Sequence, residues 1–529
     1  MIGMFMALLC CGCTDKVGVL GTSDSEPSKL VVTLRVDEDA LKGGSRAQGN
    51  YGATTEEIKI NSLTLFYTQV NKDVETVEGH NTVMQPDLSQ LLKFELPATK
   101  GTKRFYLAAN ISQAQIEAFV GDKSVYSLPK SDLLHSYSNA NQLMDIDAST
   151  GRGSNVLMTA RITQFLQQDI LVTSGEIHID TPVKLERVVS KVLLTCATTT
   201  HEGSDYVVLN EDIGWTKLND VRYMGNMFSR KLYLFPQVDP EDDVTPGSLM
   251  DANYAMSDLI MRDETTGNYI VRPDKYEEYM DNFQFYDLYE QIDMLKAVSD
   301  KPYHEAVKYD RDRLDVSSDN LYTEGMYFPE NRVKKDMEIL AMGSYSPEES
   351  VEMTSRLLTT HLLVTARFVP KTVVIDDKGA LKEITVATEE EMLSNYLIES
   401  KEVLAGENKT YQQGTFWYYD KKFYTLEGMK LFLKLEGVNE ATHITRADME
   451  RYDGGWGYYY TFIDGKANNG VIDHLNLKSW GLSRNHYYIL NVKKLIPPGA
   501  SVPGNKLMKI PTEQLEWIDK GGSDITVIP

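Results

Sequence analysis

Three of the four cysteines, Cys10, Cys11 and Cys13, crowd the extreme N-terminus of the chain. They follow a short apolar run, residues 2–9, which cannot span a bilayer but suits the core of a signal peptide. A small residue before a cysteine just after such a core is typical of a bacterial lipobox. We therefore predict that Cys13, preceded by Gly12, carries a lipid, with Cys11 as the second candidate.

The spacing Cys10-x-x-Cys13 also matches a redox or metal-binding motif. We disfavour that interpretation because the pair is single and lies inside a cleavable signal. No Lys or Arg precedes the apolar core, which departs from a signal peptide and indicates a true start further upstream. The fourth cysteine, Cys196, lies in the apolar run 192–196, and we expect a buried small hydrophobe rather than a nucleophile.

Catalytic signatures are missing from the sequence: it has no nucleophile elbow, P-loop, dinucleotide-binding fingerprint or His-Glu-x-x-His motif. The nine histidines are scattered, with no pair at ligand spacing. We therefore predict a protein that is not an enzyme, with no catalytic, cofactor-binding or metal-ligating residues. A glycosidase pair of carboxylates stays open, because its two acids need not be close in sequence and the 77 acids single out no pair.

Two local patterns could bind a ligand. Residues 310–315 superficially resemble a calcium loop, but they lack an acid at the fifth position and a glycine at the sixth, so we favour a self-paired loop. The aromatic clusters at 411–424 and 452–462 could line a sugar-binding surface. Alternating aromatics on neighbouring strands are more often core and cross-strand pairs, and we favour packing.

The net charge of −23 excludes one class of partner. An acidic surface repels phosphate backbones, so we expect no nucleic acid partner. The length of 529 residues exceeds the size of about 250–300 at which single cores stop growing, which predicts two domains.

The elements that must position any site are mostly strands. Alternation begins at residues 30–36, where every second residue is apolar, and apolar or alternating runs recur along the chain. These runs are residues 58–67, 104–110, 188–194, 231–235, 361–369, 416–419, 458–463 and 486–492. Strands outnumber helices and do not alternate with them, so we predict an all-β dominated fold.

Helical pieces are expected to be subordinate. Thr388 to Glu391 has the form of a capping box, residues 112–120 suit a short helix, and residues 276–296 have helical character. The acidic stretch 238–350, with few strand signals, reads as a partly helical insertion, and a polar break near 198–204 is a plausible domain boundary.

Several short motifs follow one another in an order that matches a known family. They are Gly43 to Gly49 around Arg46, Leu185 to Val192 with Glu186-Arg187, Leu218 to Tyr223, Tyr327 to Asn331, His361 to Lys371, Ser483 to Tyr488 with Arg484-Asn485, and Pro497 to Gly499. Each is unspecific alone, but their shared order across about 500 residues is not. The chain resembles the fimbrillins of type V pili of Bacteroidales, especially the Mfa-type (minor fimbria) subunit of Porphyromonas.

The resemblance implies two transthyretin-like β-sandwich domains in a structural fimbrial subunit. It also implies export as a lipoprotein, anchoring in the outer membrane and cleavage by an arginine-specific protease after Arg46, with Ala47 as the new N-terminus. Loss of the first strand then opens a groove, which a strand from another copy or a related subunit fills. The protein would pass from the cell outer membrane to an extracellular fimbrium and support adhesion to a host or bacterial surface ligand.

The residues support this mechanism independently, because residues 30–36 form a strand that a Gly-, Ser- and Asn-rich loop holding Arg46 separates from the next. Within this loop region Lys42 could equally be cut. The predicted division has four segments. They are a signal peptide at 1–13, a tether and removable first strand at 14–46, an N-terminal sandwich at 47–200, and a C-terminal sandwich at 201–529 with its insertion at about 238–350.

One departure concerns the end of the chain. Polymerising members of the family usually continue past a Val-x-Pro segment with a final strand, often the donor, whereas this chain stops at Val527-Ile528-Pro529. We expect either a truncated C-terminus or a subunit that does not donate a strand in the usual manner. Shaft, tip and anchor roles therefore all stay open. The main rival interpretation is an outer-membrane surface glycan-binding lipoprotein that keeps its first strand and binds oligosaccharide through the aromatic clusters.

Overall fold

The structure of the chain is a computed structural model. It describes residues 29–37, 54–71, 74–97, 100–121, 126–127, 134–136, 143–146, 153–160, 170–172, 175–233, 235, 260–262, 269–271, 274, 277, 283–297, 303–309, 325–329, 331–332, 359–404, 407–437, 449–463, 481–482, 484–503 and 512–516.

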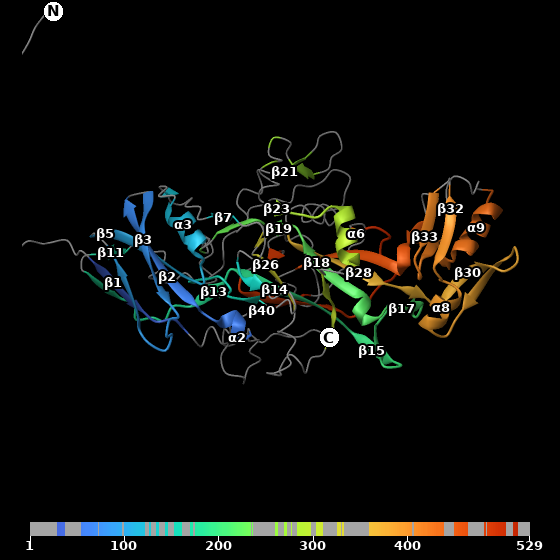
Figure 1. Cartoon of the computed structure of the whole chain (residues 1–529), viewed down its shortest axis with the longest axis horizontal. Coiled ribbons are helices and arrows are strands. Elements are labelled where there is room, and N and C mark those ends of the chain that lie inside the picture. Colours follow the sequence, from blue (N-terminus) through green and yellow to red (C-terminus); the bar gives the residue numbers. More distant parts are fainter. Residues whose placement is uncertain are drawn as a thin grey trace, which may run out of the picture.

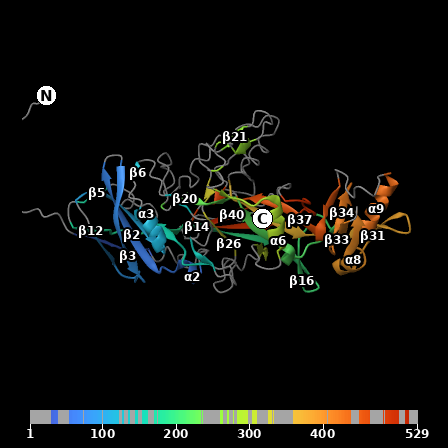
Figure 2. The same cartoon turned by 45° about the horizontal axis from the view of Figure 1, so that its top comes forward.

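The described part of the chain is elongated, with three groups of sheets along its long axis (Figures 1 and 2). N-terminal strands form one end, and strands from the middle and the C-terminal part of the chain mix in the centre. A smaller group of strands and helices forms the other end. The prediction of an all-β dominated fold is confirmed.

The first sandwich is made by two sheets that face each other. A three-stranded sheet has the order β12-β1-β4, and the opposing sheet has the order β13-β10-β5-β2-β3-β6, with β11 also pairing with β5. The strands are β1 (Leu30–Leu34), β2 (Ser62–Asn71), β3 (Val74–Met84), β4 (Leu92–Leu96), β5 (Gly101–Ala109), β6 (Tyr126–Ser127), β10 (Met158–Ala160), β11 (Ile170–Val172), β12 (Glu176–His178) and β13 (Leu185–Arg187). Alternate residues of both sheets enclose one hydrophobic core, to which Leu34, Phe94 and Leu107 belong.

The second sandwich combines strands that are far apart in sequence. One sheet has the order β25-β14-β39-β40, with β26 also pairing with β14, and the other has the order β24-β18-β28-β37. The strands are β14 (Val189–Cys196), β18 (Val221–Asn226), β24 (His304–Glu305), β25 (Val307–Lys308), β26 (Met326–Pro329), β28 (His361–Arg367), β37 (Trp456–Phe462), β39 (His486–Val492) and β40 (Thr512–Glu516). Val192, Tyr223 and Leu490 are members of the core between the sheets.

A distal lobe, residues 372–452, is inserted between β28 and β37. Its sheet has the order β31-β30-β35-β34-β36 and carries two helices, which are coloured orange in Figure 1. The elements are β30 (Thr372–Asp376), β31 (Leu381–Thr385), α8 (Glu389–Asn395), β34 (Phe416–Tyr419), β35 (Lys422–Tyr424), α9 (Leu426–Leu435) and β36 (Glu450–Tyr452). No local sequence pattern separates this lobe from the sandwiches, because its strands look like those of a sandwich.

The remaining elements are short. They are α2 (Thr55–Ile58), α3 (Gln113–Gly121), β7 (Leu134–Ser136), β8 (Asp145–Ile146), β9 (Gly153–Ser154), β15 (Thr198–His201), β16 (Ser204–Val207), β17 (Gly214–Trp215), η3 (Leu218–Asp220), β19 (Phe228–Ser229), β20 (Lys231–Tyr233), β21 (Ile260–Arg262), β22 (Tyr269–Val271), β23 (Phe283–Gln284), α6 (Leu288–Lys296), β27 (Asn331–Arg332), β29 (Val369–Pro370), β32 (Ser400–Leu404), β33 (Glu407–Tyr411), η7 (Asp453–Gly455) and β38 (Gly481–Leu482).

Each of the three predicted helical segments coincides at least in part with a helix. The predicted helix at 112–120 is α3, and the capping box before α8 is present as far as Thr388, whose side chain accepts a hydrogen bond from the backbone N of Glu391. α6 forms the last part of the predicted helical stretch 276–296. The prediction of a strand starting at residue 58 is wrong, because Ile58 ends α2 and β2 begins only at Ser62.

The chain moves from the first sandwich to the second within one extended run. β13 belongs to the first sandwich and β14 to the second, and Val188 between them belongs to the first core. The polar break at 198–204 forms the hairpin of β15 and β16. The chain passes from the sheet of β13 to the sheet of β14 at Val188. The predicted domain bounds themselves stay predictions.

Candidate functional site

The predicted removable strand, β1, is the central strand of a three-stranded sheet. It runs antiparallel to β4, with pairs from Leu30 opposite Leu96 to Leu34 opposite Leu92, and parallel to β12. The side chains of Leu30, Val32 and Leu34 have no exposed surface. This one short strand therefore closes one side of the first core.

Backbone hydrogen bonds continue the pairing beyond β1 itself. The N of Val31 donates to the O of Gly175 at 2.7 Å, and the N of Val183 donates to the O of Arg35 at 2.7 Å. Val36, which is also buried, forms a parallel bridge with Val183. Loss of this segment would leave backbone groups of β4 and β12 without their partners, at the rim of an apolar slot.

The residues predicted for processing lie beside this strand in sequence. Arg46, Ala47 and the alternative site Lys42 fall between residues 37 and 54, outside the described residues, as does the lipidation candidate Cys13. The structure therefore fixes the two ends of the processing segment, Asp37 and Thr54, and the sites themselves stay predictions.

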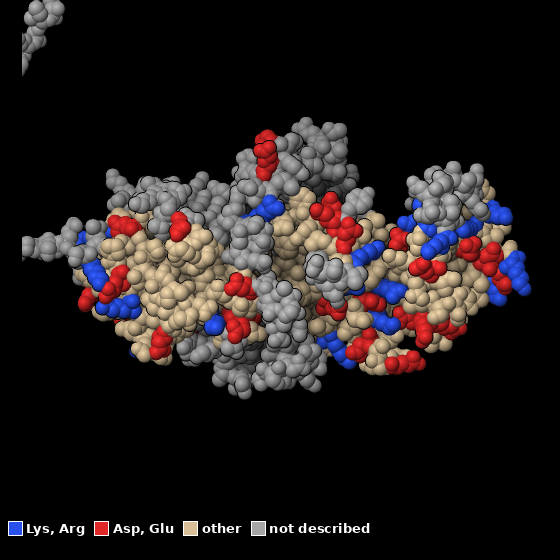
Figure 3. Space-filling model, viewed as in Figure 1, with Lys and Arg blue, Asp and Glu red and all other residues tan. Residues whose placement is uncertain are grey.

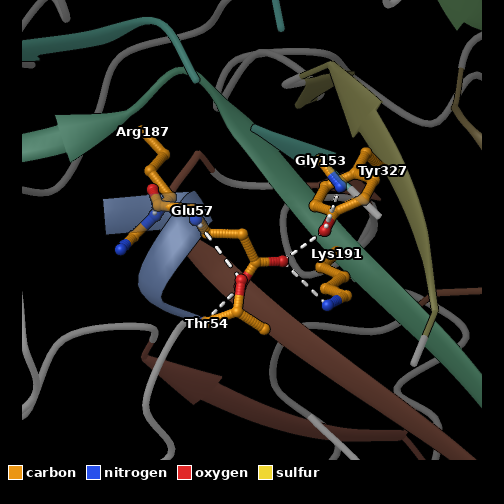
Figure 4. A network of polar contacts seen from close by, with 6 residues as sticks. All are labelled: Thr54, Glu57, Gly153, Arg187, Lys191 and Tyr327. Carbon is orange, nitrogen blue, oxygen red and sulfur yellow. Dashed lines mark hydrogen bonds and ion pairs between the residues drawn. The ribbon is translucent and has the colours of Figure 1, made fainter. Parts of the chain in front are cut away.

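The first element after that segment, α2, starts a buried polar network (Figure 4). Thr54 and Glu57 form a reciprocal capping box, in which the N of Thr54 donates to Glu57 Oε2 at 2.7 Å. Glu57 Oε1 accepts hydrogen bonds from Nζ of Lys191 on β14, at 2.9 Å, and from the hydroxyl of Tyr327 on β26. The hydroxyl of Tyr327 in turn accepts a hydrogen bond from the N of Gly153 on β9 at 3.0 Å.

A second arm of the network joins two motifs that carry the family resemblance. Arg187, buried at the end of β13, donates from Nη1 to Oδ1 of Asn485 at 3.0 Å and from Nε to the O of Glu57 at 3.3 Å. The neighbouring Arg484 donates from Nη1 to the hydroxyl of Thr159 on β10 at 3.3 Å. The loop before β39 thus reaches from the second sandwich into the first.

Burial and neighbouring charge have opposite effects on the pKa of Glu57 in this network. Burial alone would raise the pKa of Glu57, but the Lys191 ammonium and hydrogen bonds from Lys191, Tyr327 and Thr54 outweigh it and hold that pKa below its ordinary value. Burial lowers the pKa of Arg187 to about 10, so this guanidinium stays charged at neutral pH. The network is therefore an ionised cluster that binds both sandwiches together.

Arg187, Lys191, Tyr327 and Asn485 enter the sequence motifs only as members of longer segments, and no motif contains Glu57. Two signals could have found Glu57 and Lys191. Lys191 interrupts the apolar run of β14, where a buried lysine needs an acid. Thr54 and Glu57 have the spacing of a capping box.

The aromatic clusters belong to the cores. Trp417, Tyr452 and Tyr458 are each at most 2% exposed, and the rings of Phe416 and Tyr452 stack 4.9 Å apart. This burial supports the packing interpretation over a sugar-binding surface.

The other chemical candidates yield no further site. Burial raises the pKa of the Cys196 thiol to about 12, as expected of a small core residue. Within the described ranges, no three His, Cys, Asp or Glu side chains gather into a group that could hold a metal. The calcium-like residues 310–315 lie outside those ranges.

Two surface properties complete the description. No helix of the described residues is both long and apolar enough to cross a membrane. On the face drawn in Figure 3, acidic side chains are interspersed with basic ones over both ends of the molecule.

Residues 29–187 match the family model of the major fimbrial subunit protein (FimA). No curated protein sequence matches the chain.

Three solved structures are similar over most of their length. A candidate cell adhesion protein of Parabacteroides distasonis ATCC 8503 is 12% identical, with 93% of this chain and 98% of that chain covered and a TM-score of 0.40. A fimbrilin (fimA) of Porphyromonas gingivalis W83 is 13% identical, with 92% and 98% covered and a TM-score of 0.37. The tip fimbrial protein Mfa3 of Porphyromonas gingivalis, truncated at its C-terminus, is 11% identical, with 92% and 100% covered and a TM-score of 0.32.

The matched segment runs from the residue before β1 to the last residue of β13, so it spans the first sandwich and α2. The resemblance to fimbrillins that the sequence motifs indicated is thus confirmed for residues 29–187, the part of the chain that matches the major fimbrial subunit (FimA) family.

Proposed function

We propose that this chain is a structural subunit of a cell-surface fimbria, matured by cleavage after Arg46 and assembled by β-strand exchange. The observation that supports it best is the position of β1, a central strand with a fully buried apolar face. β1 precedes the segment that holds Arg46, so one cut would separate it covalently from the rest of the sandwich.

The energetics of β1 favour a replacement over an empty groove. Burying a Val or Leu side chain contributes about 1.5–3 kcal/mol, so Leu30, Val32 and Leu34 together contribute on the order of 5–9 kcal/mol. The backbone pairs with β4 and β12 add to this drive. A strand from another subunit that presents apolar residues at alternate positions would recover both terms.

The proposal extends to export and partners. A lipid on Cys13 would hold the precursor in the outer membrane through the tether 14–28, and an arginine-specific protease would release β1. The partners are then other copies or related fimbrial subunits, and the assembled fimbria supports adhesion. A chain that functions as a scaffold in this way needs no catalytic residues.

Incubation of a lipid-free precursor with an arginine-specific protease tests the proposal directly. We expect a new N-terminus at Ala47 and a detergent-resistant ladder on an unboiled gel, and the Arg46→Ala variant should show neither. A Lys42→Ala variant should behave as the unchanged precursor does. If residues 30–36 stayed attached while the body resisted the protease, the proposal would fail.

A peptide-binding measurement isolates the groove. A synthetic peptide of residues 29–37 should bind the cleaved protein after β1 has been removed under mild denaturant, and it should not bind the uncleaved protein. A matched peptide that carries Val32→Lys places a charge where Val32 is fully buried and should not bind. Equal binding of both peptides would contradict the role of the apolar slot.

A further inference from the structure

We propose that α2, through its buried Glu57, sets a limit to proteolysis from the N-terminus: a protease that cuts after both Lys and Arg removes the chain before Thr54 but is stopped at Lys59. Lys59 is the next basic residue after Arg46. An arginine-specific protease does not cut after lysine, so this limit concerns proteases of broader specificity. The protection of Lys59 is a property of the folded chain and does not rest on the proposed maturation.

Lys59 by itself has the features of a cleavage site. Its side chain is exposed, and its backbone is extended, with φ −67° and ψ 126°. Proteases bind their substrates in extended conformations, so the protection of the bond between Lys59 and Ile60 must come from the groups that hold this backbone in place.

The backbone after α2 is held by Asn110. Its Nδ2 donates to the O of Lys59, the carbonyl that a protease would have to polarise, at 2.8 Å. Its Oδ1 accepts a hydrogen bond from the N of Asn61, also at 2.8 Å. The N of Gln85 donates to the O of Asn61 at 2.8 Å. Cleavage after Lys59 therefore requires these bonds to open.

The backbone before Lys59 is held by the Glu57 network. A helix of one turn is not stable alone, so α2 persists only through its tertiary contacts. Glu57 accepts hydrogen bonds from Lys191 and Tyr327 through its carboxylate and from Arg187 through its backbone O, and all four residues are buried. These contacts come from β14, β26 and β13.

A cut after Lys59 would have a different consequence from a cut after Arg46. It would detach Glu57 from the body, so that buried Lys191 would lose the Glu57 carboxylate and buried Arg187 would lose the backbone O of Glu57. Breaking a buried ion pair by removing one partner is strongly destabilising. A cut in the segment before Thr54 leaves the whole network in the mature protein, which is why the position of the limit matters.

The test is limited digestion of the full chain with trypsin, followed by mass determination of the new N-termini. The test variant is Glu57→Gln, and the matched control is Glu56→Gln, which changes the neighbouring exposed carboxylate in the same turn. We expect the unchanged chain and the control to be cut before Thr54 and not after Lys59. The Glu57→Gln variant should start at Ile60, with a rate at Lys59 raised about a hundred-fold or more.

A second measurement separates local opening from general unfolding. Cleavage after Lys434, on the exposed side of α9 in the distal lobe, should be unchanged in Glu57→Gln. The double variant Glu57→Gln/Lys191→Met removes both charges and should lower the rate at Lys59 at least about tenfold below that of Glu57→Gln.

The outcomes distinguish the two proposals. If the unchanged chain is cut after Lys59 as quickly as before Thr54, or if Glu57→Gln stays protected, the limit at α2 is refuted. If the segment before Thr54 resists the protease while Glu57→Gln alone opens Lys59, the limit stands and the proposed maturation fails.

Discussion

Arg187 and Asn485, which are 298 positions apart, form two hydrogen bonds at the junction of the two sandwiches. The backbone N of Arg187 donates to Asn485 Oδ1 at 3.3 Å, and Nη1 donates to the same oxygen at 3.0 Å. Asn485 has a positive φ of 59°, and its own N donates to the O of Val189 at 2.8 Å. One amide therefore fixes the end of β13 against the start of β39.

Replacing this amide should destabilise the protein. In Asn485→Ala a buried guanidinium loses an acceptor, and an alanine must adopt a left-handed backbone. We expect the free energy of unfolding to fall by about 2–4 kcal/mol. Urea unfolding followed by tryptophan fluorescence measures the change.

Asn485→Gly is the matched control, because it separates the cost of the left-handed backbone from the cost of the lost acceptor. Glycine adopts the positive φ without strain, so this variant should recover about 1 kcal/mol relative to alanine while still lacking the acceptor. Equal stability of both variants and the unchanged protein would show that the contact contributes nothing.

The inward face of β1 should carry its contribution to stability. Leu34 has no exposed surface, and Leu34→Ala should cost about 2–5 kcal/mol through lost burial and a cavity. Val31 on the opposite face is partly exposed, and Val31→Ala should cost less than about 1 kcal/mol. Chemical denaturation of the uncleaved protein compares the two, and a reversed order would contradict the orientation of the strand.

The stability of the second sandwich should depend on pH through His304. Burial, with a smaller contribution from the Lys191 ammonium, lowers the pKa of His304 from 6.5 to about 4. Between these pH values the unfolded chain binds a proton that the native chain does not, so stability falls with falling pH. The loss amounts to about 3 kcal/mol in total.

His304→Gln should flatten this part of the stability curve, measured as urea midpoints from pH 7 to pH 4. The matched control is His201→Gln, which changes an exposed histidine in the hairpin of β15 and β16 and should leave the slope as it is. An unchanged slope in His304→Gln would show that this histidine titrates normally.

Gly457 should not tolerate a side chain. The loop around Pro498 crosses β37 so closely that a Cβ at Gly457 would overlap the carbonyl oxygen of Pro498, and Tyr458 and Ala500 exchange backbone hydrogen bonds beside it. Gly457→Ala should therefore cost about 3 kcal/mol or more. Gly203→Ala, at a positive φ of 79° in open space, should cost only about 1 kcal/mol. Thermal unfolding of both variants tests this difference.

Much of the fold could be predicted because strands leave a local signal. Alternating apolar residues predict β1, the apolar run 486–492 predicts β39, and residues 112–120 suit the helix found as α3. The apolar spacing of 58–67 predicts a strand that includes Ile58. The capping box of Thr54 and Glu57 instead folds one helical turn there, and tertiary contacts of Glu57 hold it.

The distal lobe could not be separated from the sequence. Its strands have the same composition as those of the sandwiches, and only the pairing of β28 with β37 across residues 372–452 shows that the segment between them is an insertion. Pairing over such a distance is decided by which edges and apolar faces meet, and no short window of sequence contains that information.

The sequence by itself determined the class of the fold and the resemblance to fimbrillins, since the first depends on local pattern and the second on the order of motifs. Only the tertiary structure decided that Glu57, Lys191, Arg187 and Asn485 form one buried network. These residues come from α2, β14, β13 and the loop before β39, and burial makes their charges depend on one another. A buried ion pair is a property of two distant residues and the low-dielectric space they share, which exists only once the chain has folded.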